Sequence, residues 1–242
     1  MKKVKAWKMK NLTGVSLDRL GNFFVTGKNG KIIKYDPDGN VLARLSTTQP
    51  TLLEPWYHPS IFIYNRSQQQ YSLFDRNFEN QKKFAIEPSL AIEPYMVCPT
   101  HDNKLWILDK ADWSAKKVNP LTQEVILEFE IDQPGFTDCI YLREYLNLLI
   151  VLDRKAGILI LNHLGKPIET IPVKKPGAIY FYGEDLYYLE NNALKFFNLV
   201  TEERHEMNLP PDTQWAVLTD ERLLTFSSTR RITLYSYRSP GE

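Results

Sequence analysis

The sequence predicts an all-β protein, a six-bladed β-propeller whose blades are four-stranded antiparallel sheets. Three observations predict this fold class. A unit of apolar strands separated by short polar turns recurs along the chain, and equivalent positions in successive copies lie 37 to 44 residues apart, the period of a propeller blade. The strand positions are rich in β-branched and aromatic residues, and they lack the i, i+3, i+4 pattern of helical repeats.

Six copies of the repeat align on two consecutive apolar runs, which we assign to the second and third strands of each blade. The paired runs begin at Asn22 and Lys31, Ile61 and Tyr71, Leu105 and Ala115, Leu148 and Gly157, Leu186 and Ala193, and Leu223 and Arg231. The turns between strands carry Asp, Asn, Gly and Pro, as in residues 36–40, and these residue types tolerate tight turns and positive φ.

A weaker apolar stretch before each pair supplies the first, innermost strand of each blade. These stretches are residues 13–17, 52–57, 91–98, 138–142, 178–182 and 214–218. The last copy lacks a fourth strand, whereas the chain begins with an orphan strand at residues 4–8. Pairing of residues 4–8 with residues 232–237 closes the ring through the two ends of the chain and removes two exposed sheet edges. Deletion of residues 1–9 is therefore expected to destabilise the whole domain, and an unchanged thermal melt would contradict the closure.

Length and composition predict a single domain over residues 1–242. Hydrophobic residues make up 43% and charged residues 24% of the chain, which is sufficient for a globular core. Thirty Lys and Arg against 29 Asp and Glu leave a net charge of +1, so no field steers the protein towards nucleic acid or anionic lipid. The most apolar run, residues 146–152, is too short to span a bilayer, and the first residues lack the apolar core of a secretory signal.

Two stretches, residues 14–40 and residues 149–166, resemble the NHL repeat, and the other four copies look like degenerate versions of it. The resemblance implies an NHL- or TolB-like six-bladed propeller. Residues 102–110 and 141–145 also resemble uncharacterised exported propellers of bacterial envelopes. That second resemblance implies a removed signal peptide and a periplasmic or outer-membrane-associated location, with a cytoplasmic location as the alternative. Because such propellers have many unrelated roles, the resemblance implies architecture rather than activity.

Candidate binding residues come from the mouth of the central channel, where loops between neighbouring blades converge. Two first-strand segments share a Glu-Pro-aromatic signature, in which Glu54 precedes Trp56 and Glu93 precedes Tyr95, and Asp138 stands near the corresponding place in the fourth blade. Three carboxylates at one mouth could hold a divalent cation such as Ca²⁺, or could receive a basic group of a partner. The alternative is that each carboxylate pairs with a nearby Lys or Arg of this chain.

Aromatic and polar residues add further expectations. Trp215, like Trp56 and Tyr95, lies near a first strand and could belong to an aromatic rim of the kind found at interaction hot spots, with packing between blades as the alternative. His58 and His101 precede the second strands of adjacent blades, where a shared site is the alternative to surface loops. The residue after the second strand is expected to accept backbone N–H bonds within its hairpin; these residues are Asn65, Asp109, Asp153 and Glu190.

The two cysteines, Cys98 and Cys139, are expected to be isolated buried thiols, with a disulfide between them as the alternative in an oxidising compartment.

Together these features predict a non-catalytic binding or scaffold propeller, a protein-interaction subunit of the bacterial envelope that engages a protein partner through one face. The sequence contains no nucleophile elbow, Walker loop or H-E-x-x-H motif, and no cofactor is expected. One alternative is a metal-dependent hydrolase or lactonase with Glu54, Glu93 and Asp138 around the cation. A second is an RNA-binding NHL-type propeller, although Lys and Arg are not interleaved with aromatics into an RNA-binding stripe. Metal analysis with a Glu93→Ala comparison tests the first alternative, and steeply salt-dependent affinity tests the second.

Overall fold

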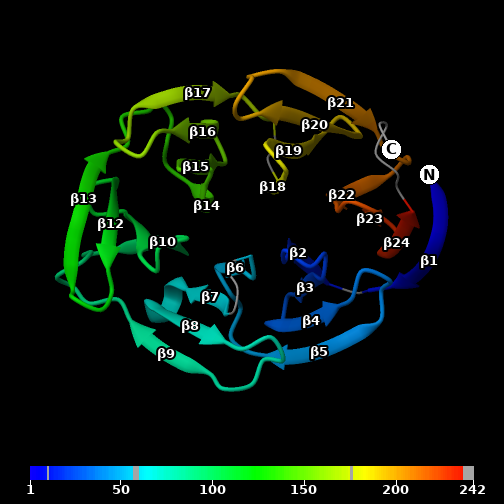
Figure 1. Cartoon of the computed structure of the whole chain (residues 1–242), viewed down its shortest axis with the longest axis horizontal. Helices are drawn as coiled ribbons and strands as arrows, with labels where there is room; N and C mark the ends of the chain where they lie inside the picture. The colour runs from blue at the N-terminus through cyan, green and yellow to red at the C-terminus, as the bar shows by residue number, and fades with distance from the viewer. Residues whose placement is uncertain (10, 57–59, 175–176, 237–242) are drawn as a thin grey trace. The chain divides into compact units, whose positions relative to one another are not determined.

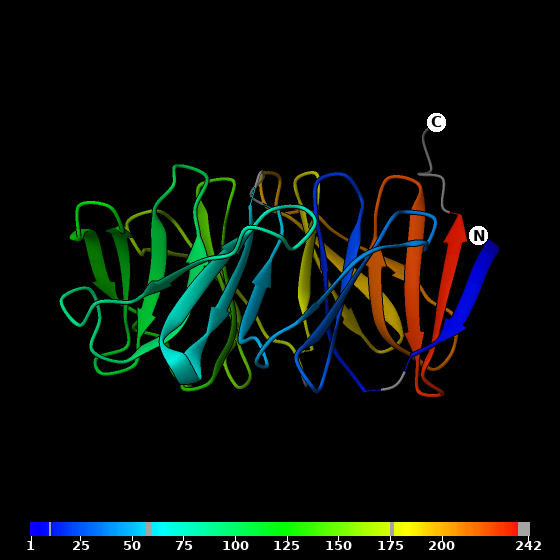
Figure 2. The same cartoon turned by 90° about the horizontal axis from the view of Figure 1, so that it is seen from below.

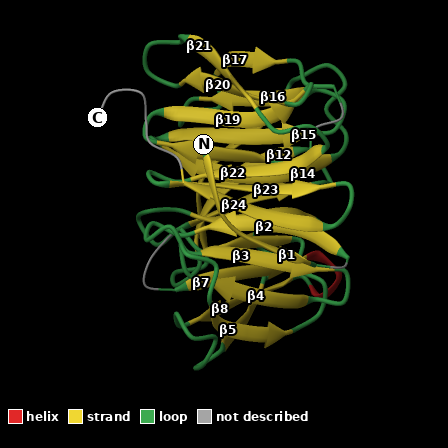
Figure 3. Cartoon of the chain, turned by 90° about the vertical axis from the view of Figure 1, so that its right-hand side faces the viewer, coloured by secondary structure: helices red, strands yellow, loops and turns green. Residues whose placement is uncertain are grey.

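The computed structural model describes residues 1–9, 11–56, 60–174 and 177–236, which form β-strands almost throughout. The only helix in these ranges is one 3-10 turn, η1 (Arg66–Gln68), drawn red in Figure 3. The strands form six separate four-stranded antiparallel sheets, which confirms the predicted six blades of an all-β propeller. In the part of the chain that the structure describes, no helix has the length and apolar character needed to cross a membrane.

The chain divides into two compact units. Unit 1 consists of residues 1–47 and 177–242 and contains the first, fifth and sixth blades, whereas unit 2 consists of residues 48–176 and contains the second, third and fourth blades. The expectation of one domain over residues 1–242 stays a prediction.

In unit 1 the strands of a blade follow one another in chain order, except that the N-terminal strand completes the sixth blade (Figure 1). The first blade has β2 (Leu12–Leu17), β3 (Phe23–Gly27), β4 (Lys31–Tyr35) and β5 (Val41–Ser46); the fifth has β18 (Ile179–Tyr182), β19 (Asp185–Glu190), β20 (Ala193–Asn198) and β21 (Arg204–Asn208); and the sixth has β22 (Thr213–Leu218), β23 (Arg222–Ser227), β24 (Arg231–Ser236) and β1 (Lys2–Lys8).

Unit 2 repeats the same order without exception. The second blade has β6 (Leu52–Glu54), β7 (Ile61–Asn65), β8 (Gln70–Phe74) and β9 (Lys82–Ala85); the third has β10 (Pro94–Pro99), β11 (Leu105–Asp109), β12 (Ser114–Asn119) and β13 (Glu124–Glu130); and the fourth has β14 (Cys139–Tyr145), β15 (Leu148–Asp153), β16 (Gly157–Leu161) and β17 (Pro167–Ile171). All six predicted first strands are present, with ends shifted by a few residues.

The pairing of the chain's two ends is confirmed in the sixth blade. Strand β1 runs antiparallel to β24, from Lys2 opposite Ser236 to Lys8 opposite Arg231, and Figure 2 shows the two strands side by side. Residue 237, part of the predicted partner, lies outside the described residues. The ring of Trp7 also packs against two aromatic rings of the first blade. The N-terminal strand therefore contributes both a sheet edge and core contacts to unit 1.

Turns between the third and fourth strands use one local device in five blades. A side-chain oxygen at the end of the third strand accepts backbone N–H bonds from the following turn. The residues that provide it are Asp36, Asp75, Asn119, Asn162 and Asn198. In the first of these turns Gly39 has a φ of 76°, a conformation that glycine adopts without strain.

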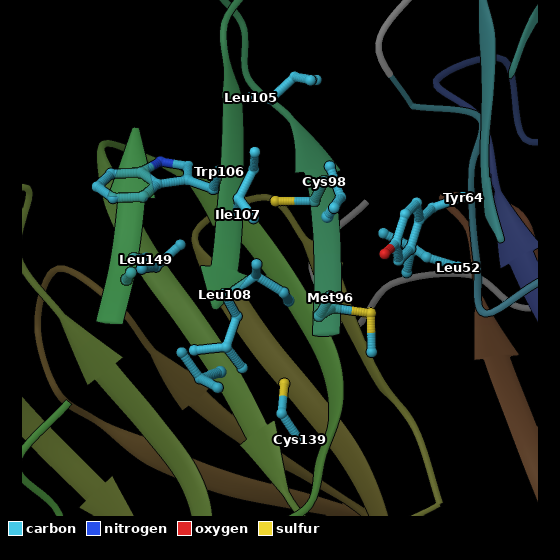
Figure 4. Packing of buried hydrophobic residues seen from close by; sticks show 14 of the residues in the cluster. Leu52, Tyr64, Met96, Cys98, Leu105, Trp106, Ile107, Leu108, Cys139 and Leu149 are labelled. Carbon is cyan, nitrogen blue, oxygen red and sulfur yellow. The ribbon is translucent and has the colours of Figure 1, made fainter. Parts of the chain in front are cut away.

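The core of unit 2 is shared by all three of its blades (Figure 4). Trp106 on β11 and Tyr64 on β7 are its largest fully buried side chains, and the Tyr64 hydroxyl donates a hydrogen bond to the Pro94 carbonyl of the next blade. Cys98 and Cys139 are buried and free, as isolated thiols. Burial raises the pKa of both thiols above the ordinary value, so neither is a reactive thiolate at neutral pH.

In unit 1 a hydrogen bond connects the fifth blade directly to the first blade, although the sixth blade lies between them in the order of blades. The Tyr180 hydroxyl on β18 donates a hydrogen bond of 3.1 Å to the Val15 carbonyl on β2. Tyr187 on β19 binds the sixth blade, because its hydroxyl donates to the Leu218 carbonyl and accepts from the Leu218 N–H. Neutral tyrosine hydroxyls thus link the three blades of unit 1.

Candidate partner-binding surface

The two Glu-Pro-aromatic segments lie at opposite ends of their first strands. Glu54 is the last residue of β6 and pairs with Phe62, whereas Pro94 is the first residue of β10 and pairs with Asp109. The expectation that Glu54 and Glu93 occupy equivalent places in their blades is therefore wrong. The register of a first strand is determined by all of its pairs with the second strand, so a shared Glu-Pro-aromatic signature of three residues does not determine it.

Glu54 and Trp56 belong to a buried cluster in unit 2. The Glu54 side chain is 2% exposed, lies 3.6 Å from the Arg143 Nε, and accepts a hydrogen bond of 3.3 Å from the Tyr141 hydroxyl. Its other oxygen accepts the backbone N–H of Trp56 at 2.9 Å. The Arg143 guanidinium lies over the rings of Trp56 and Tyr145, 4.9 and 5.3 Å from their centroids. This cluster joins the second and fourth blades across the third.

Tyr95 is the extra residue of a β-bulge at the start of β10. Its two neighbours pair with consecutive residues of β11, which leaves Tyr95 without a partner in the ladder. A bulge turns its side chain away from the regular alternation, and Tyr95 is half-buried at the end of the blade. The same bulge occurs in three further blades, with Thr13, Ile140 and Gln214 as the extra residues. A bulge at the start of the first strand is therefore a recurring feature of the blade repeat.

Cationic side chains surround the Tyr95 ring. The residue after the second strand is basic in three consecutive blades, as Arg66, Lys110 and Arg154. The Arg66 guanidinium lies 3.5 Å from the centroid of the Tyr95 ring, and its Nε donates a hydrogen bond of 2.5 Å to the Tyr95 carbonyl. The Lys110 Nζ lies 5.4 Å from the same ring centroid. Arginine stacked on an aromatic ring is held in one orientation before any partner arrives.

The carboxylates of Glu93 and Asp138 each pair with one of these cations. Glu93 lies 3.6 Å from the Lys110 Nζ, and Asp138 lies 2.8 Å from the Arg154 Nε and accepts the Tyr95 hydroxyl at 3.2 Å. The hydrogen bond from Arg154 is the main cause that lowers the pKa of Asp138 below its ordinary value, while partial burial opposes it. Both carboxylates are therefore engaged by cations of their own chain.

Two buried aspartates hold the backbone segments that carry this surface. Asp109 accepts the backbone N–H groups of Ile92 and Glu93, at 2.8 and 2.9 Å, and that of Ala111 in its own hairpin. Asp153 does the same in the fourth blade for residues 137, 138, 155 and 156. The expected hairpin role is confirmed for these two residues and for Asn65, whose side-chain oxygen accepts the Gln68 N–H at 3.3 Å. Asp109 and Asp153 also fix the segment that leads into the first strand.

Apolar groups complete the patch. The Trp113 ring packs edge-on against Tyr95, with centroids 5.5 Å apart, and against the buried Phe136 at 5.1 Å. Ile92, just before β10, is 74% exposed. We name this patch the Tyr95 surface, and it comprises Arg66, Ile92, Glu93, Tyr95, Lys110, Trp113, Asp138 and Arg154.

The ligand atoms of Glu54, Glu93 and Asp138 do not all lie within 4.8 Å of one another. Among the described residues, one group of three metal-ligating side chains has its ligand atoms within 4.8 Å of one another, and it consists of other residues: His101, Asp102 and Glu144. There the Lys117 ammonium lies 3.0 Å from Glu144 and 3.5 Å from Asp102, so it supplies the positive charge that a metal ion would bring. Glu144 also accepts hydrogen bonds from the Trp106 Nε1 and pairs with His101. Glu144 is buried and both of its oxygens have partners within the chain, whereas His101 and Asp102 are exposed.

The remaining predicted residues lie elsewhere. Trp215 on β22 lines a hollow in unit 1, together with Lys28 and Arg230. His58, proposed with His101 for a shared site, lies outside the described residues.

The sequence analysis missed the cations and Trp113. A signal for the cations was available, because Asn65, Asp109 and Asp153, which end the second strands, are each followed by Arg or Lys. Trp113 sits in a tight hairpin with a φ of 56°, and no sequence pattern marks that conformation for a tryptophan.

Solved structures with low sequence identity to this chain share its fold. BamB from Moraxella catarrhalis is 11% identical with a TM-score of 0.52, over 93% of this chain and 85% of that one. The extracellular domain of the putative hybrid two-component system BT4673 from B. thetaiotaomicron is 12% identical with a TM-score of 0.57, over 95% of this chain but 34% of that one. A chain of the mitotic checkpoint complex is 13% identical with a TM-score of 0.57, over 94% and 77%.

At these identities the likeness shows the fold alone, and the fold is shared widely, since 918 chains match. No model of a known protein family matches the sequence, and a search of curated proteins finds no match.

Proposed function

We propose that the chain is a non-catalytic binding or scaffold propeller whose protein partner docks on the Tyr95 surface. The observation that carries this proposal is a patch of half-buried and exposed side chains in which aromatic rings and arginines are held in place by a bulge, by stacking and by buried aspartates. Tyrosine, tryptophan and arginine are the residue types enriched at interaction hot spots. Side chains that are ordered before binding lose less conformational entropy in the complex.

The charges of the surface bear on specificity. Lys110 and Arg154 face carboxylates of their own chain, so the patch presents both signs in a defined pattern. A mixed pattern rejects partners that bring like charges together, and it adds little long-range steering. The exposed Ile92 gives such a partner an apolar contact at the edge of the charged pattern.

The proposal includes the bacterial envelope as the compartment. It is supported by the resemblance of residues 102–110 and 141–145 to exported propellers, and one solved neighbour is described as an extracellular domain. Alkaline phosphatase, which folds only after export, can be fused to the natural full-length protein. Phosphatase activity is expected, and its absence would contradict the envelope location.

Site-specific photocrosslinking in the source organism tests the docking surface. A photoreactive benzoylphenylalanine at Ile92 is expected to yield a discrete crosslinked protein, whereas the same group at Leu121, 87% exposed on the β12–β13 turn, is not. The crosslink at Ile92 is expected to disappear in a Tyr95→Ala background. Equal crosslinking from both positions, or a crosslink that survives Tyr95→Ala, would overturn the assignment.

The crosslinked partner can then be purified and its affinity measured directly. Tyr95→Ala and Arg154→Ala are each expected to weaken binding at least about tenfold, the effect of a hot-spot residue, while Leu121→Ala leaves the Kd unchanged.

The hydrolase alternative required Glu54, Glu93 and Asp138 around one metal ion. Each of these carboxylates instead lies beside a basic side chain of this chain. Its test remains metal analysis of the purified protein. Stoichiometric Ca²⁺ that is lost in Glu93→Ala would overturn the proposal made here.

A further inference from the structure

The Tyr95 surface contains two arginines that are linked through one aromatic ring and one carboxylate. The Arg66 guanidinium stacks 3.5 Å from the centroid of the Tyr95 ring, and its Nε donates to the Tyr95 carbonyl. The Tyr95 hydroxyl donates to the Asp138 Oδ1 at 3.2 Å, and the Asp138 Oδ2 accepts the Arg154 Nε at 2.8 Å. These four side chains belong to the second, third and fourth blades of unit 2, so one continuous series of contacts crosses the surface.

Both arginines bind their own chain through Nε alone. Within the described part of the chain, the Nη1 and Nη2 groups of Arg66 and Arg154 donate no hydrogen bond. The Arg154 side chain is 58% exposed, and no nitrogen of the half-buried Arg66 is buried without a partner, so these Nη groups reach solvent. Guanidinium N–H groups held in a fixed orientation suit the planar oxygens of a carboxylate.

The two linked arginines carry more charge than the carboxylate between them. The hydrogen bond from Arg154, and also the charge of Arg66, act to lower the pKa of Asp138 below its ordinary value of about 4, so its carboxylate is charged at neutral pH. Two guanidiniums therefore face one carboxylate, which leaves one positive charge in excess.

The neighbouring charged groups have partners of their own. Lys110 lies 3.6 Å from Glu93, and the buried Asp109 lies 2.8 Å from the Lys116 Nζ. The buried Asp153 accepts four backbone N–H groups. The excess positive charge therefore belongs to the two arginines, and it favours an anionic group beside them.

We propose that the protein partner places one acidic side chain, an aspartate or a glutamate, against the Nη groups of Arg66 and Arg154. This inference rests on the proposed function and names the chemistry of the partner. One carboxylate brings a single negative charge and two acceptor oxygens, which match the single excess charge and the two guanidiniums. A phosphate dianion brings one charge more than the arginines have in excess. The exposed Ile92 and the half-buried Trp113 offer an apolar contact to a residue next to the acidic one.

Solution NMR of the intact protein tests the assignment with a defined probe. The readouts are the Nε–H resonances of Arg66 and Arg154, assigned from Arg66→Lys and Arg154→Lys, and the probe is acetyl-leucyl-glutamyl amide. Both resonances are expected to shift along a saturable titration curve. Acetyl-leucyl-glutaminyl amide, the uncharged match, and inorganic phosphate at equal ionic strength are each expected to bind at least fivefold more weakly. Unshifted resonances, or equal binding of either control probe, would overturn the carboxylate assignment.

Conservative variants test the two arginines separately. Arg66→Lys and Arg154→Lys keep the positive charge but remove the guanidinium, so each is expected to weaken binding of the glutamyl probe at least threefold, measured on the resonance of the other arginine. Arg44→Lys, the same change at an exposed position on β5, is the matched control and should leave the Kd unchanged. Wild-type binding in either test variant, or an equal loss in the control, would contradict the proposed contact.

The photocrosslink at Ile92 separates this inference from the proposed function. If the glutamyl and glutaminyl probes bind equally while the crosslink still depends on Tyr95, the inference fails and the docking surface stands. If the crosslink survives Tyr95→Ala, the docking surface itself is refuted, whatever the probes do.

Discussion

Units 1 and 2 join their three blades with different chemistry. In unit 1 a neutral hydroxyl of Tyr180 reaches the Val15 carbonyl past the sixth blade, whereas in unit 2 Glu54 and Arg143 form a buried ion pair across the third. A neutral hydrogen bond contributes about 1 kcal/mol to stability. A buried ion pair must first offset the desolvation of two charges, and each partner becomes costly once the other is lost. The contrast teaches that a glutamate whose sequence context suggests a metal ligand can instead form a buried ion pair in the core.

Breaking the ion pair is expected to have the largest effect. Arg143→Met leaves the Glu54 carboxylate buried without its cation, and we expect a loss of about 3–5 kcal/mol in the free energy of unfolding. Urea denaturation measures it.

Removing both charges sharpens this prediction. The double variant Glu54→Leu with Arg143→Met is expected to be more stable than Arg143→Met alone, because no uncompensated charge remains. A double variant less stable than the single one would show that packing, rather than charge, dominates the site.

A second buried carboxylate of unit 2, Asp109, tests whether burial decides the cost. Its side chain is fully buried and lies 2.8 Å from the Lys116 Nζ, so Asp109→Asn is expected to lose about 2 kcal/mol in urea denaturation. Asp112→Asn is the matched control, because Asp112 lies 3.5 Å from the same Nζ but is 44% exposed, and its loss is expected to stay below about 1 kcal/mol.

Asp109 also makes stability depend on pH. Burial acts to raise its pKa, but the hydrogen bonds from Lys116 and from backbone N–H groups outweigh burial and hold the pKa of the folded state below the ordinary value. A group with a lowered folded pKa stabilises the protein above its unfolded pKa of about 4, and that contribution is lost as pH falls through the folded value. Denaturation between pH 5 and 2 should therefore show a shallower acid loss in Asp109→Asn than in wild type; parallel curves would contradict it.

The neutral link of unit 1 is expected to matter less. Tyr180→Phe removes the hydroxyl that binds the Val15 carbonyl and keeps the ring, so a loss of about 1 kcal/mol is expected in the same assay. A loss as large as that of Arg143→Met would erase the contrast between the units.

The exposed pair on the Tyr95 surface is expected to contribute least. The side chains of Asp138 and Arg154 are 39% and 58% exposed, so Asp138→Ala should cost under about 1 kcal/mol, and less again in 1 M salt. A large, salt-independent loss would show that the surface is part of the core framework rather than a docking patch.

Much of the architecture could be predicted from particular residues. The strand that contains Trp7 and the unpaired third strand ending at Ser236 each lacked a neighbour, and they pair with each other. Asp109 and Asp153 bind their hairpins as expected, but their bonds to the segments before the first strands depend on contacts across about 16 residues, which no local pattern reveals. The sequence left open whether Glu54 binds a cation or pairs with a basic residue of this chain, and it could not decide, because its partner Arg143 lies 89 residues away.

The sequence by itself determined the number of blades, the strands within them and the pairing of the chain's two ends, because periodic hydrophobicity and turn chemistry act over a few residues and are written locally. Only the tertiary structure decided which carboxylates become buried and which remain on the surface. Register and bulges assign Glu54 to the core and Glu93 beside Tyr95, and those depend on whole-strand pairing and packing between blades.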